Sequence, residues 1–246
     1  MGYQATIEKM KLMKLKGMVR AFSSVIEAEI GSNFSPDELV AYLIDSEWDE
    51  RYNRKLTYLL RVAKFRYKVN FSDIDFTNKR NLNKDAILRL SDCQWIKNGK
   101  SVVITGATGV GKSFLASAFG NQACVNNYNT MYFSCMKIFN KLKLAKADGT
   151  YIREIEKIKK QDLLILDDFG LEPLDASSRL IFLEILEDRY KVKSTVITSQ
   201  LPMNKWHDVI NEPTIADAIC DRIFNHSHII ELKGESMRKI KTKTSD

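Results

Sequence analysis

The sequence predicts an α/β fold, in which a parallel sheet is flanked by helices and preceded by a small helical domain. Three observations support this prediction. Short apolar runs rich in β-branched residues alternate with stretches of helical periodicity between residues 101 and 232, which is typical of parallel strands joined by crossover helices. A glycine-rich loop follows the first of these runs. Residues 1–68 show helical periodicity without glycine runs.

The composition fits one core and one smaller module. The chain has 246 residues, of which 44% are hydrophobic and 28% are charged, as in a globular protein. The formal net charge of +7 allows a polyanionic partner such as nucleic acid. A basic surface that only aids solubility is an equal alternative at this stage.

The cysteine and hydropathy patterns exclude several classes of protein. Cys93, Cys124, Cys135 and Cys220 form no C-x-x-C pair, so we expect buried, reduced thiols rather than a zinc or redox site. The chain opens without the apolar stretch of a signal peptide and has no apolar run of about 18 residues. We therefore expect a cytoplasmic protein without a membrane partner.

A helix is predicted to begin near Pro36. Ser35 precedes it as an N-cap residue, and Asp37 and Glu38 place acids in its first turn. Residues 51–68 continue this helix without an acid and with several aromatic side chains. Such a stretch suits contact with a phosphate backbone, although a solvated helix face is the alternative. The candidate DNA contacts here are Arg51, Arg54, Lys55, Arg61 and Lys64.

Residues 69–80 are predicted to form a linker laid across the core. Phe71, Ile74 and Phe76 alternate with acids in this segment. Residues 80–93 show helical periodicity, and Asn98-Gly99 predicts a turn before the first strand.

The first strand and the loop after it carry the clearest functional signal. The apolar run 101–105 leads into GATGVGKS and then into a helical pattern, which is the context that a P-loop requires. Glycines in this loop can adopt positive φ and let backbone N–H groups approach phosphates at a helix N-terminus. Lys112 is predicted to reach the β- and γ-phosphates, and the Ser113 hydroxyl to bind Mg²⁺. The nucleotide-binding candidates are Gly106, Ala107, Thr108, Gly109, Val110, Gly111, Lys112, Ser113 and Phe114.

Two further segments follow the loop helix. Residues 130–134 predict a buried strand, and residues 136–160 predict two helices separated at Asp148-Gly149. The helix pair is basic, which makes it a second candidate DNA surface. Its candidate contacts are Lys141, Lys143 and Lys146.

An apolar strand over residues 163–168 ends in Asp167 and Asp168, as a Walker B element does. Beside a P-loop, Asp167 is expected to hold the Mg²⁺ shell and Asp168 to orient or deprotonate the attacking water. A strand followed by an acidic turn is the alternative.

The remaining pattern predicts a helix over 177–190, a strand over 194–200, a helix over 215–224 and a strand over 228–232. A polar side chain at the carboxyl edge of the 194–200 strand can sense a γ-phosphate or position water. Ser199 is the candidate, with Thr198 and Gln200 next to it in sequence. An ordinary polar strand end is the alternative.

Several motifs follow one another along the chain. They are GATGVGKS, LLILDDFG, STVITSQLP, Asp221-Arg222 and GESMRK, with KLKGM and KLAKADG as further segments. With these motifs the chain resembles the IstB-like family of insertion-sequence ATPases over nearly its whole length. It is also similar to the bacterial helicase loader DnaC, within the DnaA-like initiator branch of the AAA+ proteins. We therefore expect a helical domain over residues 1–68, a linker over 69–80 and a P-loop AAA+ ATPase domain over 81–246.

The resemblance also implies a function. A protein of this family binds ATP and Mg²⁺, assembles into an oligomer on double-stranded DNA and delivers target DNA to a DDE-type transposase. By motif position, Arg222 is the arginine finger that reaches the γ-phosphate of a neighbouring subunit, and Arg238 is a sensor. Asp168 stands where many AAA+ proteins have Glu, and Ser199 where many have Asn. The shorter carboxylate positions water less closely, so slow turnover is expected.

Three other functions stay open beside a transposition helper in the bacterial cytoplasm. A helicase loader would use the N-terminal helices to hold a protein partner. A small-molecule phosphotransferase would need converging arginines around a substrate pocket, whereas Arg222 and Arg238 already have other expected roles. A nucleotide-binding scaffold would bind ATP without turnover.

Overall fold

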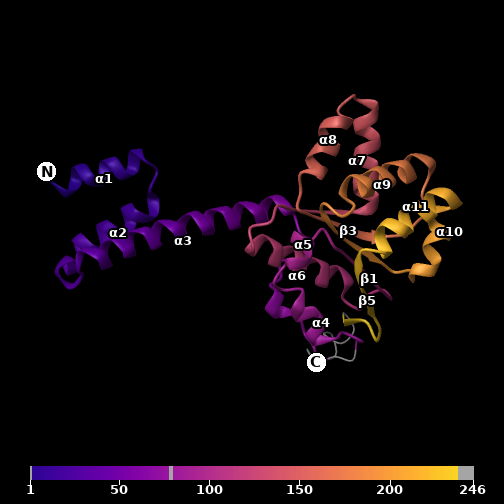
Figure 1. Cartoon of the computed structure of the whole chain (residues 1–246), viewed down its shortest axis with the longest axis horizontal. Coiled ribbons are helices and arrows are strands. Elements are labelled where there is room, and N and C mark those ends of the chain that lie inside the picture. The colour runs from indigo at the N-terminus through magenta and orange to yellow at the C-terminus, as the bar shows by residue number, and fades with distance from the viewer. Residues whose placement is uncertain (1, 78–79, 238–246) are drawn as a thin grey trace, which may run out of the picture. The chain divides into compact units, whose positions relative to one another are not determined.

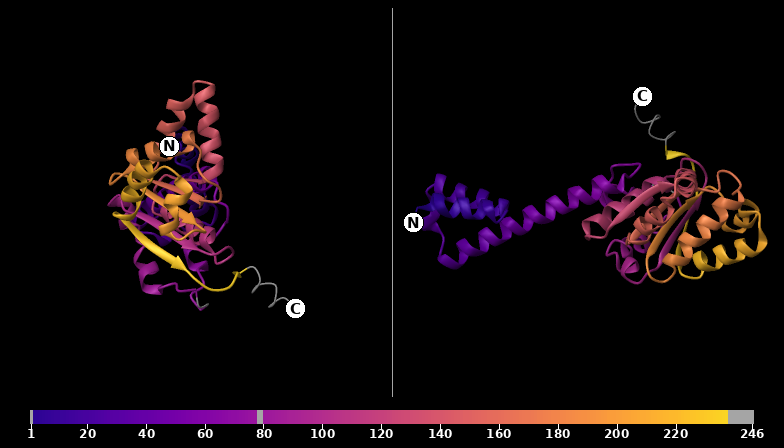
Figure 2. Two further views of the ribbon diagram at one scale, coloured as in Figure 1. Left: turned by 90° about the vertical axis from the view of Figure 1, so that its right-hand side faces the viewer. Right: turned by 90° about the horizontal axis from the view of Figure 1, so that it is seen from above.

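The computed structural model describes residues 2–77 and 80–237 (Figure 1). The chain divides into two compact units, Met1–Tyr58 and Leu59–Asp246. The first unit is helical, and the second contains a five-stranded sheet with helices on both faces (Figure 2). The predicted α/β core and helical N-terminal region are therefore confirmed.

The N-terminal unit is built from three helices and a 3-10 turn. They are α1 (Tyr3–Leu12), α2 (Lys16–Glu27), the turn Ile30–Asn33, and α3 (Pro36–Ala63), which continues beyond this unit. Helix α3 begins where the sequence predicts. The Glu38 N–H donates to Ser35 Oγ at 3.3 Å, and the Ser35 N–H donates to Glu38 Oε2 at 2.8 Å, so the two residues form a capping box.

Gly17 sets the contact between α2 and α3. A Cβ atom at Gly17 would lie 2.2 Å from the Ser46 carbonyl oxygen, so a side chain there would separate the helices. The Gly17 N–H donates to Glu47 Oε2 at 2.8 Å, and Arg51 Nε donates to Glu47 Oε1 at 2.6 Å. The buried Glu47 carboxylate is thereby paired within the N-terminal unit.

The division between the two units falls earlier than the boundary predicted near residue 68. Leu59 and Ala63, in the last turns of α3, are buried. Phe65 and Phe71 pack against a hydrophobic cluster of the second unit. The end of α3 and the segment after it are thus held to the sheet-containing unit by apolar side chains.

The sheet has the strand order β2-β3-β4-β1-β5, and all neighbouring pairs are parallel. The strands are β1 (Ser101–Gly106), β2 (Thr130–Ser134), β3 (Leu163–Phe169), β4 (Ser194–Ser199) and β5 (Ser227–Leu232). The helices of this unit are α4 (Lys84–Arg89), α5 (Gln94–Lys97), α6 (Lys112–Val125), α7 (Cys135–Ala147), α8 (Tyr151–Lys159), α9 (Ala176–Arg189), α10 (Trp206–Ile210) and α11 (Pro213–Phe224), with 3-10 turns at Phe71–Asp73 and Met203–Lys205. All strands therefore end at one edge of the sheet, where α/β proteins bind ligands.

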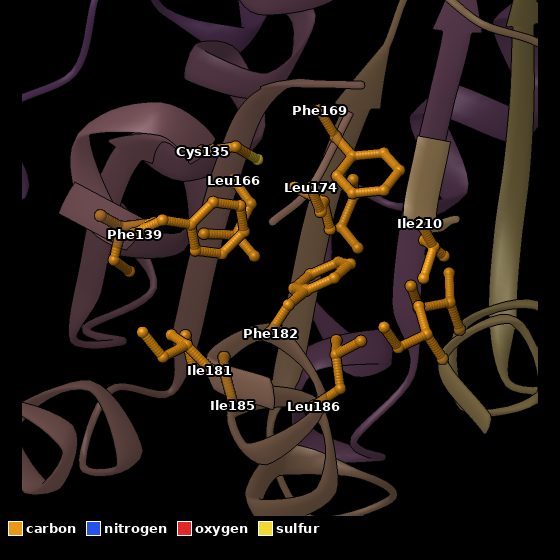
Figure 3. Close-up of a cluster of buried hydrophobic side chains, with 14 of the residues drawn as sticks. Cys135, Phe139, Leu166, Phe169, Leu174, Ile181, Phe182, Ile185, Leu186 and Ile210 are labelled. Atoms are coloured by element: carbon orange, nitrogen blue, oxygen red, sulfur yellow. The ribbon is translucent and has the colours of Figure 1, made fainter. Parts of the chain in front are cut away.

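Alternate residues of the central strands face two hydrophobic clusters. Ile104 of β1 packs in the cluster that includes α6, and Val103 packs in the cluster that includes α7, α9 and α11. In the second cluster the Phe182 ring lies 5.8 Å from the Phe139 ring and 5.1 Å from the Phe169 ring, centroid to centroid (Figure 3). The clusters fix the sheet between its helices, and the loops at its carboxyl edge are thereby positioned.

One predicted helix is shorter than the sequence pattern indicates. The helix predicted over residues 80–93 is confined to α4, because Asn83 caps its start by accepting from the Ala86 N–H at 3.0 Å. Asn81 and Cys93 have left-handed backbones, with φ of 57° and 58°, which ends helical geometry on either side. The predicted break at Gly149 is confirmed, with φ of 75° between α7 and α8.

All four cysteines are free and buried, as expected. Burial raises the pKa of Cys93 to about 12 and that of Cys124 to about 11, so both remain protonated thiols at neutral pH. Within residues 2–77 and 80–237, no helix combines the length and apolar character that crossing a membrane requires.

Candidate nucleotide-binding site

The P-loop connects β1 to α6 at the carboxyl edge of the sheet. Gly106, Gly109 and Gly111 have φ of 147°, 86° and 101°, which L side chains rarely adopt. A Cβ atom at Gly106 would also lie 2.3 Å from the Leu232 carbonyl oxygen of β5. Backbone conformation and close packing therefore both require glycine here, as the sequence predicts.

Lys112 is buried at the N-terminus of α6, with 6% of its surface exposed. Its Nζ donates to the carbonyl oxygens of Gly106 at 2.7 Å and Ala107 at 2.8 Å. Burial lowers the pKa of Lys112, and the negative charges of Asp168 and Asp167 oppose that change. The ammonium group is thus held within the loop, at a helix N-terminus suited to anions.

Asp167 is fully buried near the end of β3. The Tyr132 hydroxyl on β2 donates to its Oδ2, and the Thr198 hydroxyl on β4 donates to its Oδ1. Burial and the negative charge of Asp167 raise the pKa of Tyr132, so that the phenol remains a donor. Neighbouring strands therefore fix the orientation of this carboxylate.

Asp168 occupies an irregular point in β3. Its φ is 60°, and the pairing of β3 with β4 shifts register between Leu166 and Phe169. The Asp168 N–H donates to Thr198 Oγ1 at 3.0 Å. Because of its left-handed backbone, Asp168 does not follow the regular alternation of side chains along β3. Its carboxylate lines a cavity.

Arg66, in the segment after α3, contacts both carboxylates. Its NH1 atom lies 3.1 Å from Asp167 Oδ2 and 2.8 Å from Asp168 Oδ2. Burial alone would lower the pKa of Arg66, but the hydrogen bonds to the two acids raise it above its ordinary value. The guanidinium group therefore neutralises part of this acidic pair.

These groups surround one cavity of about 360 Å³, within the size range of small-molecule sites. Apolar and aromatic side chains form part of the wall, where a flat base could pack. They are Tyr67, Phe114, Leu171 and Met237. Polar and charged groups form the rest, together with Gly109 and Gly111: Arg66, Asp73, Asp75, Arg80, Thr108, Lys112, Ser113, Asp168 and Gln200. Cationic and backbone donors next to apolar walls fit the chemistry of a nucleotide.

Arg80 supplies a further test of that fit. The residue is buried, and its guanidinium donates to the Asp75 carbonyl oxygen and, at 3.3 Å, to that of Val110. Its Nε is buried without a hydrogen-bond partner among the residues that the structure describes. A buried cationic donor without a partner is costly, and an anionic ligand in the adjoining cavity is chemically suited to it.

A magnesium ion would depend on the nucleotide as well as on the protein. In the described part of the chain, no cluster of three or more His, Cys, Asp or Glu residues could hold a metal alone. Ser113 lines the cavity, and the buried Asp167 shares the Arg66 guanidinium with Asp168, which also lines it. This oxygen set fits Mg²⁺, which usually combines few protein ligands with phosphate oxygens and water.

The three polar residues at the end of β4 and just after it have different partners. Thr198 contacts the acidic pair, as described above. Ser199 is buried, donates to the Phe169 carbonyl oxygen at 2.9 Å and accepts from the Leu201 N–H at 3.1 Å. Gln200 lines the cavity and accepts from the Thr108 hydroxyl of the P-loop at 2.6 Å. The Ser199 hydroxyl is thus committed to main-chain partners, and Gln200 is the side chain of this group that reaches the cavity.

The two candidate arginines from the C-terminal region are in different situations. Arg222, on α11, donates to Glu187 Oε1 at 2.7 Å and to the Ala218 carbonyl oxygen at 2.9 Å. It does not belong to the described lining of the nucleotide cavity. Arg238 lies outside the described residues.

Several candidate DNA contacts already have partners. Arg51 pairs with Glu47, Lys141 with Glu154 at 2.5 Å, and Lys143 with Asp175 at 2.5 Å. Lys146 lies 4.6 Å from the centre of the Tyr151 ring. The basic side chains remain partly exposed, whereas the Glu47 and Glu154 side chains are mostly buried, so each paired side chain would have to leave its carboxylate to bind phosphate.

Sequence reasoning did not assign Arg66, Arg80 or Tyr132 to the site. Arg66 stood out only as one member of a basic run, Tyr132 as part of a buried strand, and Arg80 as the start of a helical stretch. A lone polar group in an apolar strand, such as the Tyr132 hydroxyl, was the available signal, because it needs a partner when buried.

Known proteins are similar to this chain over almost its whole length. The insertion sequence ATP-binding protein y4pL of Sinorhizobium fredii (strain NBRC 101917 / NGR234) is 43% identical over 234 residues, which cover 95% of this chain and 96% of that protein. The insertion sequence IS232 ATP-binding protein of Bacillus thuringiensis subsp. berliner is 27% identical over 237 residues, covering 96% of this chain and 95% of that protein.

Solved structures share the fold. The crystal structure of the DnaC helicase loader has a TM-score of 0.58 and 21% identity, covering 68% of this chain and 98% of that chain. AMPPCP-bound DnaA from Aquifex aeolicus has a TM-score of 0.60 and 21% identity, covering 74% of this chain and 56% of that chain. The predicted P-loop AAA+ fold is therefore confirmed. The family described as IstB-like ATP binding protein matches residues 8–245, and the chain belongs to this family of insertion-sequence ATP-binding proteins.

Proposed function

We propose that this protein is an ATPase that assembles on duplex DNA and presents target DNA to the transposase of its insertion sequence. One observation carries the proposal: Lys112 of the P-loop and the acidic residue Asp168 line the same cavity, and the buried Asp167 shares the Arg66 guanidinium with Asp168. A phosphate-binding cation beside two carboxylates is the arrangement that phosphoryl transfer to water requires. The insertion-sequence names of the relatives support the biological setting.

The residues of this chain would divide the chemistry as follows. Lys112 exchanges the Gly106 and Ala107 carbonyl oxygens for β- and γ-phosphate oxygens, while backbone N–H groups of the loop contact the phosphates. Asp168 orients the attacking water and accepts its proton. Ser113 and Asp167 would hold Mg²⁺, which neutralises charge on the phosphates when bound.

Gln200 is the stronger candidate for sensing the γ-phosphate. It lines the cavity and contacts Thr108 of the P-loop, whereas the Ser199 hydroxyl serves the backbone. Gln200→Ala should therefore slow turnover more than Ser199→Ala does. Rate measurements on the two variants, at saturating ATP, test this assignment.

Arg222 would act on the site of a neighbouring subunit. Its position outside the described cavity lining supports a role in trans, where a cation stabilises charge on the transferring phosphoryl group. We expect Arg222→Ala and Asp168→Asn each to be inactive alone. A mixture should regain turnover, because intact arginines of one variant meet intact carboxylates of the other. No recovery at any mixing ratio would contradict a finger in trans.

The basic residues would bind DNA without reading its sequence. The expected binding requires ATP and weakens steeply with salt, because each neutralised phosphate releases a condensed counterion. Fluorescence anisotropy of labelled duplexes, with and without ATP, tests this. Replacing Arg54 and Lys55 by Gln should lower the salt slope by about one for each phosphate that these side chains neutralise. An unchanged slope would place the DNA elsewhere.

The protein partner can be tested separately. A pull-down against the transposase of the same element and against a replicative helicase distinguishes a transposition helper from a helicase loader. The likeness to DnaC supports only the fold at 21% identity, so we expect the transposase to be retained. Retention of the helicase alone would favour the loader. We further propose that this function is carried out in the bacterial cytoplasm.

A further inference from the structure

We propose that Arg66 competes with Mg²⁺ for Asp167 while it also pairs with Asp168, so that this arginine sets how readily the ATP site accepts its metal. The inference rests on the proposed ATPase function and assigns a positioning residue to it. It starts from one nitrogen atom, Arg66 NH1, which lies 3.1 Å from Asp167 Oδ2 and 2.8 Å from Asp168 Oδ2. A single cationic group that bridges two carboxylates takes the electrostatic role that a metal ion would have there.

Asp167 does not need Arg66 to hold its orientation. Tyr132 and Thr198, on the two neighbouring strands, donate to its two oxygens. Removing the guanidinium therefore leaves the carboxylate fixed and buried, ready for another cation. Arg66 therefore balances the charge of the acidic pair, whereas the hydrogen bonds from the neighbouring strands hold the Asp167 carboxylate in place.

Asp168 depends more directly on Arg66. The ion pair places a positive charge 2.8 Å from the carboxylate oxygen that would accept a proton from water. While Arg66 stays in this position, its guanidinium occupies the Asp168 oxygen that would contact the attacking water.

The contact can exchange when another cation arrives. Water screens the ion pair of Arg66 with Asp168, because their side chains are 42% and 24% exposed. Asp167 is fully buried, so Arg66 can leave it only when another cation takes its place. The guanidinium also lies 5.9 Å from the centre of the adjacent Tyr67 ring, which gives it a second surface to rest on. A divalent ion, with twice the charge, can therefore displace it.

Because Arg66 lies in the segment after α3, replacement of its guanidinium by Mg²⁺ would also affect this segment. Helix α3 ends at Ala63, and Lys64 has a left-handed φ of 55°, so Arg66 lies just past the end of this helix. Linkage between two binding events is reciprocal. Any partner that pulls this segment away from the acids should strengthen metal loading, and metal loading should in turn release the segment.

The test is a Mg²⁺ titration of the binding of a fluorescent ATP analogue to the full-length protein. Arg66→Gln should lower the Mg²⁺ concentration for half-maximal binding by about threefold to tenfold, as expected for removing one partly exposed charged group. Affinity for the analogue at saturating Mg²⁺ should stay unchanged. Arg66→Lys keeps the charge and should restore the wild-type midpoint. Lys68→Gln is the matched control, because it removes a neighbouring exposed charge, and it should leave the midpoint unchanged.

Amide hydrogen exchange provides a second readout that does not depend on turnover. In the wild type, the Mg²⁺-bound analogue should accelerate exchange across residues 64–70, and in Arg66→Gln these amides should exchange fast without it. An unchanged Mg²⁺ midpoint in Arg66→Gln would overturn the inference. A higher midpoint or weaker binding at saturating Mg²⁺ would also overturn it, because Arg66 would then be a nucleotide ligand. If the wild type failed to bind the analogue at any Mg²⁺ concentration, the proposed function itself would be refuted.

Discussion

Replacing Asp168 with Asn tests the proposed water-activating role of this residue with little disturbance to the fold. Asn has the same size as Asp and tolerates the left-handed φ of 60° found at this position. The N–H that donates to Thr198 Oγ1 is unaffected. The amide side chain cannot accept the proton of an attacking water, and general-base groups typically contribute about 10²- to 10⁴-fold to rate. We therefore expect turnover to fall by at least about 100-fold, or about 2.7 kcal/mol.

Stability should change much less than turnover does. The variant loses the ion pair with Arg66, whose side chain is 42% exposed. Screening by water limits such a pair to about 1 kcal/mol or less, which corresponds to a fall in melting temperature of about 2–4 °C at most for a domain of this size. Nucleotide binding should be retained, because Lys112 and the P-loop are unchanged.

Phosphate release, binding of a fluorescent ATP analogue and thermal melting should be measured on the same preparation. Glu172→Gln is the matched control, since it makes the same carboxylate-to-amide change at an exposed residue nearby in the chain, and it should behave as the wild type does. If assembly on DNA requires bound ATP, Asp168→Asn complexes should also persist on duplex DNA. Wild-type turnover in Asp168→Asn would show that another group activates the water.

Four other changes have defined outcomes. Lys112→Ala should abolish measurable binding of the ATP analogue, because the cation inside the P-loop is lost. Thr198→Val removes a donor to Asp167 and an acceptor for the Asp168 N–H. Thermal melting should report a free energy of unfolding that is lower by about 1–3 kcal/mol, and ATP binding should need more Mg²⁺. Arg189→Ala removes the buried guanidinium, so the carbonyl oxygens that accept from it lose their donor. Urea unfolding should then report a free energy of unfolding that is lower by about 3–5 kcal/mol. Hydrogen bonds from Lys141 and Lys157 lower the pKa of Glu154 to about 2 from an ordinary value of 4.5. A carboxyl group whose pKa is lowered in the folded state stabilises the fold at pH values above its ordinary pKa, and this contribution is lost as the pH falls toward about 2. The free energy of unfolding of Glu154→Gln should therefore decrease less steeply than that of the wild type as the pH falls through this range.

The sequence was sufficient for those parts of the site that depend on local geometry. The P-loop follows from glycine spacing between a strand and a helix, and Asp167 follows from the rule that parallel strands present their carboxyl ends at one edge. The start of α3 follows from the capping residues Ser35 and Glu38. In each case the signal lies within a few consecutive residues.

Contacts between distant segments could not be predicted in this way. Arg66 reaches Asp167 across 101 positions of the chain, and no local pattern distinguishes it from the other cations of its basic run. Ser199 illustrates a second limit. The register shift in β3 places Phe169 opposite Ser199, and the serine hydroxyl then donates to the Phe169 carbonyl oxygen. Strand periodicity alone does not indicate such an irregularity.

Arg66 and Arg222 of the proposed ATPase each pair with carboxylates of their own subunit, and both would have to change partner for turnover. Arg66 pairs with Asp167 and Asp168, and Arg222 pairs with Glu187, whose side chain is 50% exposed. The Arg66–Asp168 and Arg222–Glu187 pairs are partly exposed and contribute about 1 kcal/mol or less each. The buried Asp167 needs another cation in place of Arg66, which a bound metal ion can supply. A subunit restrained by weak pairs at both points would remain inactive alone and become active on assembly, without a large barrier to either state. Slow, assembly-dependent turnover would follow from that arrangement, and it would suit the proposed function, in which hydrolysis times the release of DNA.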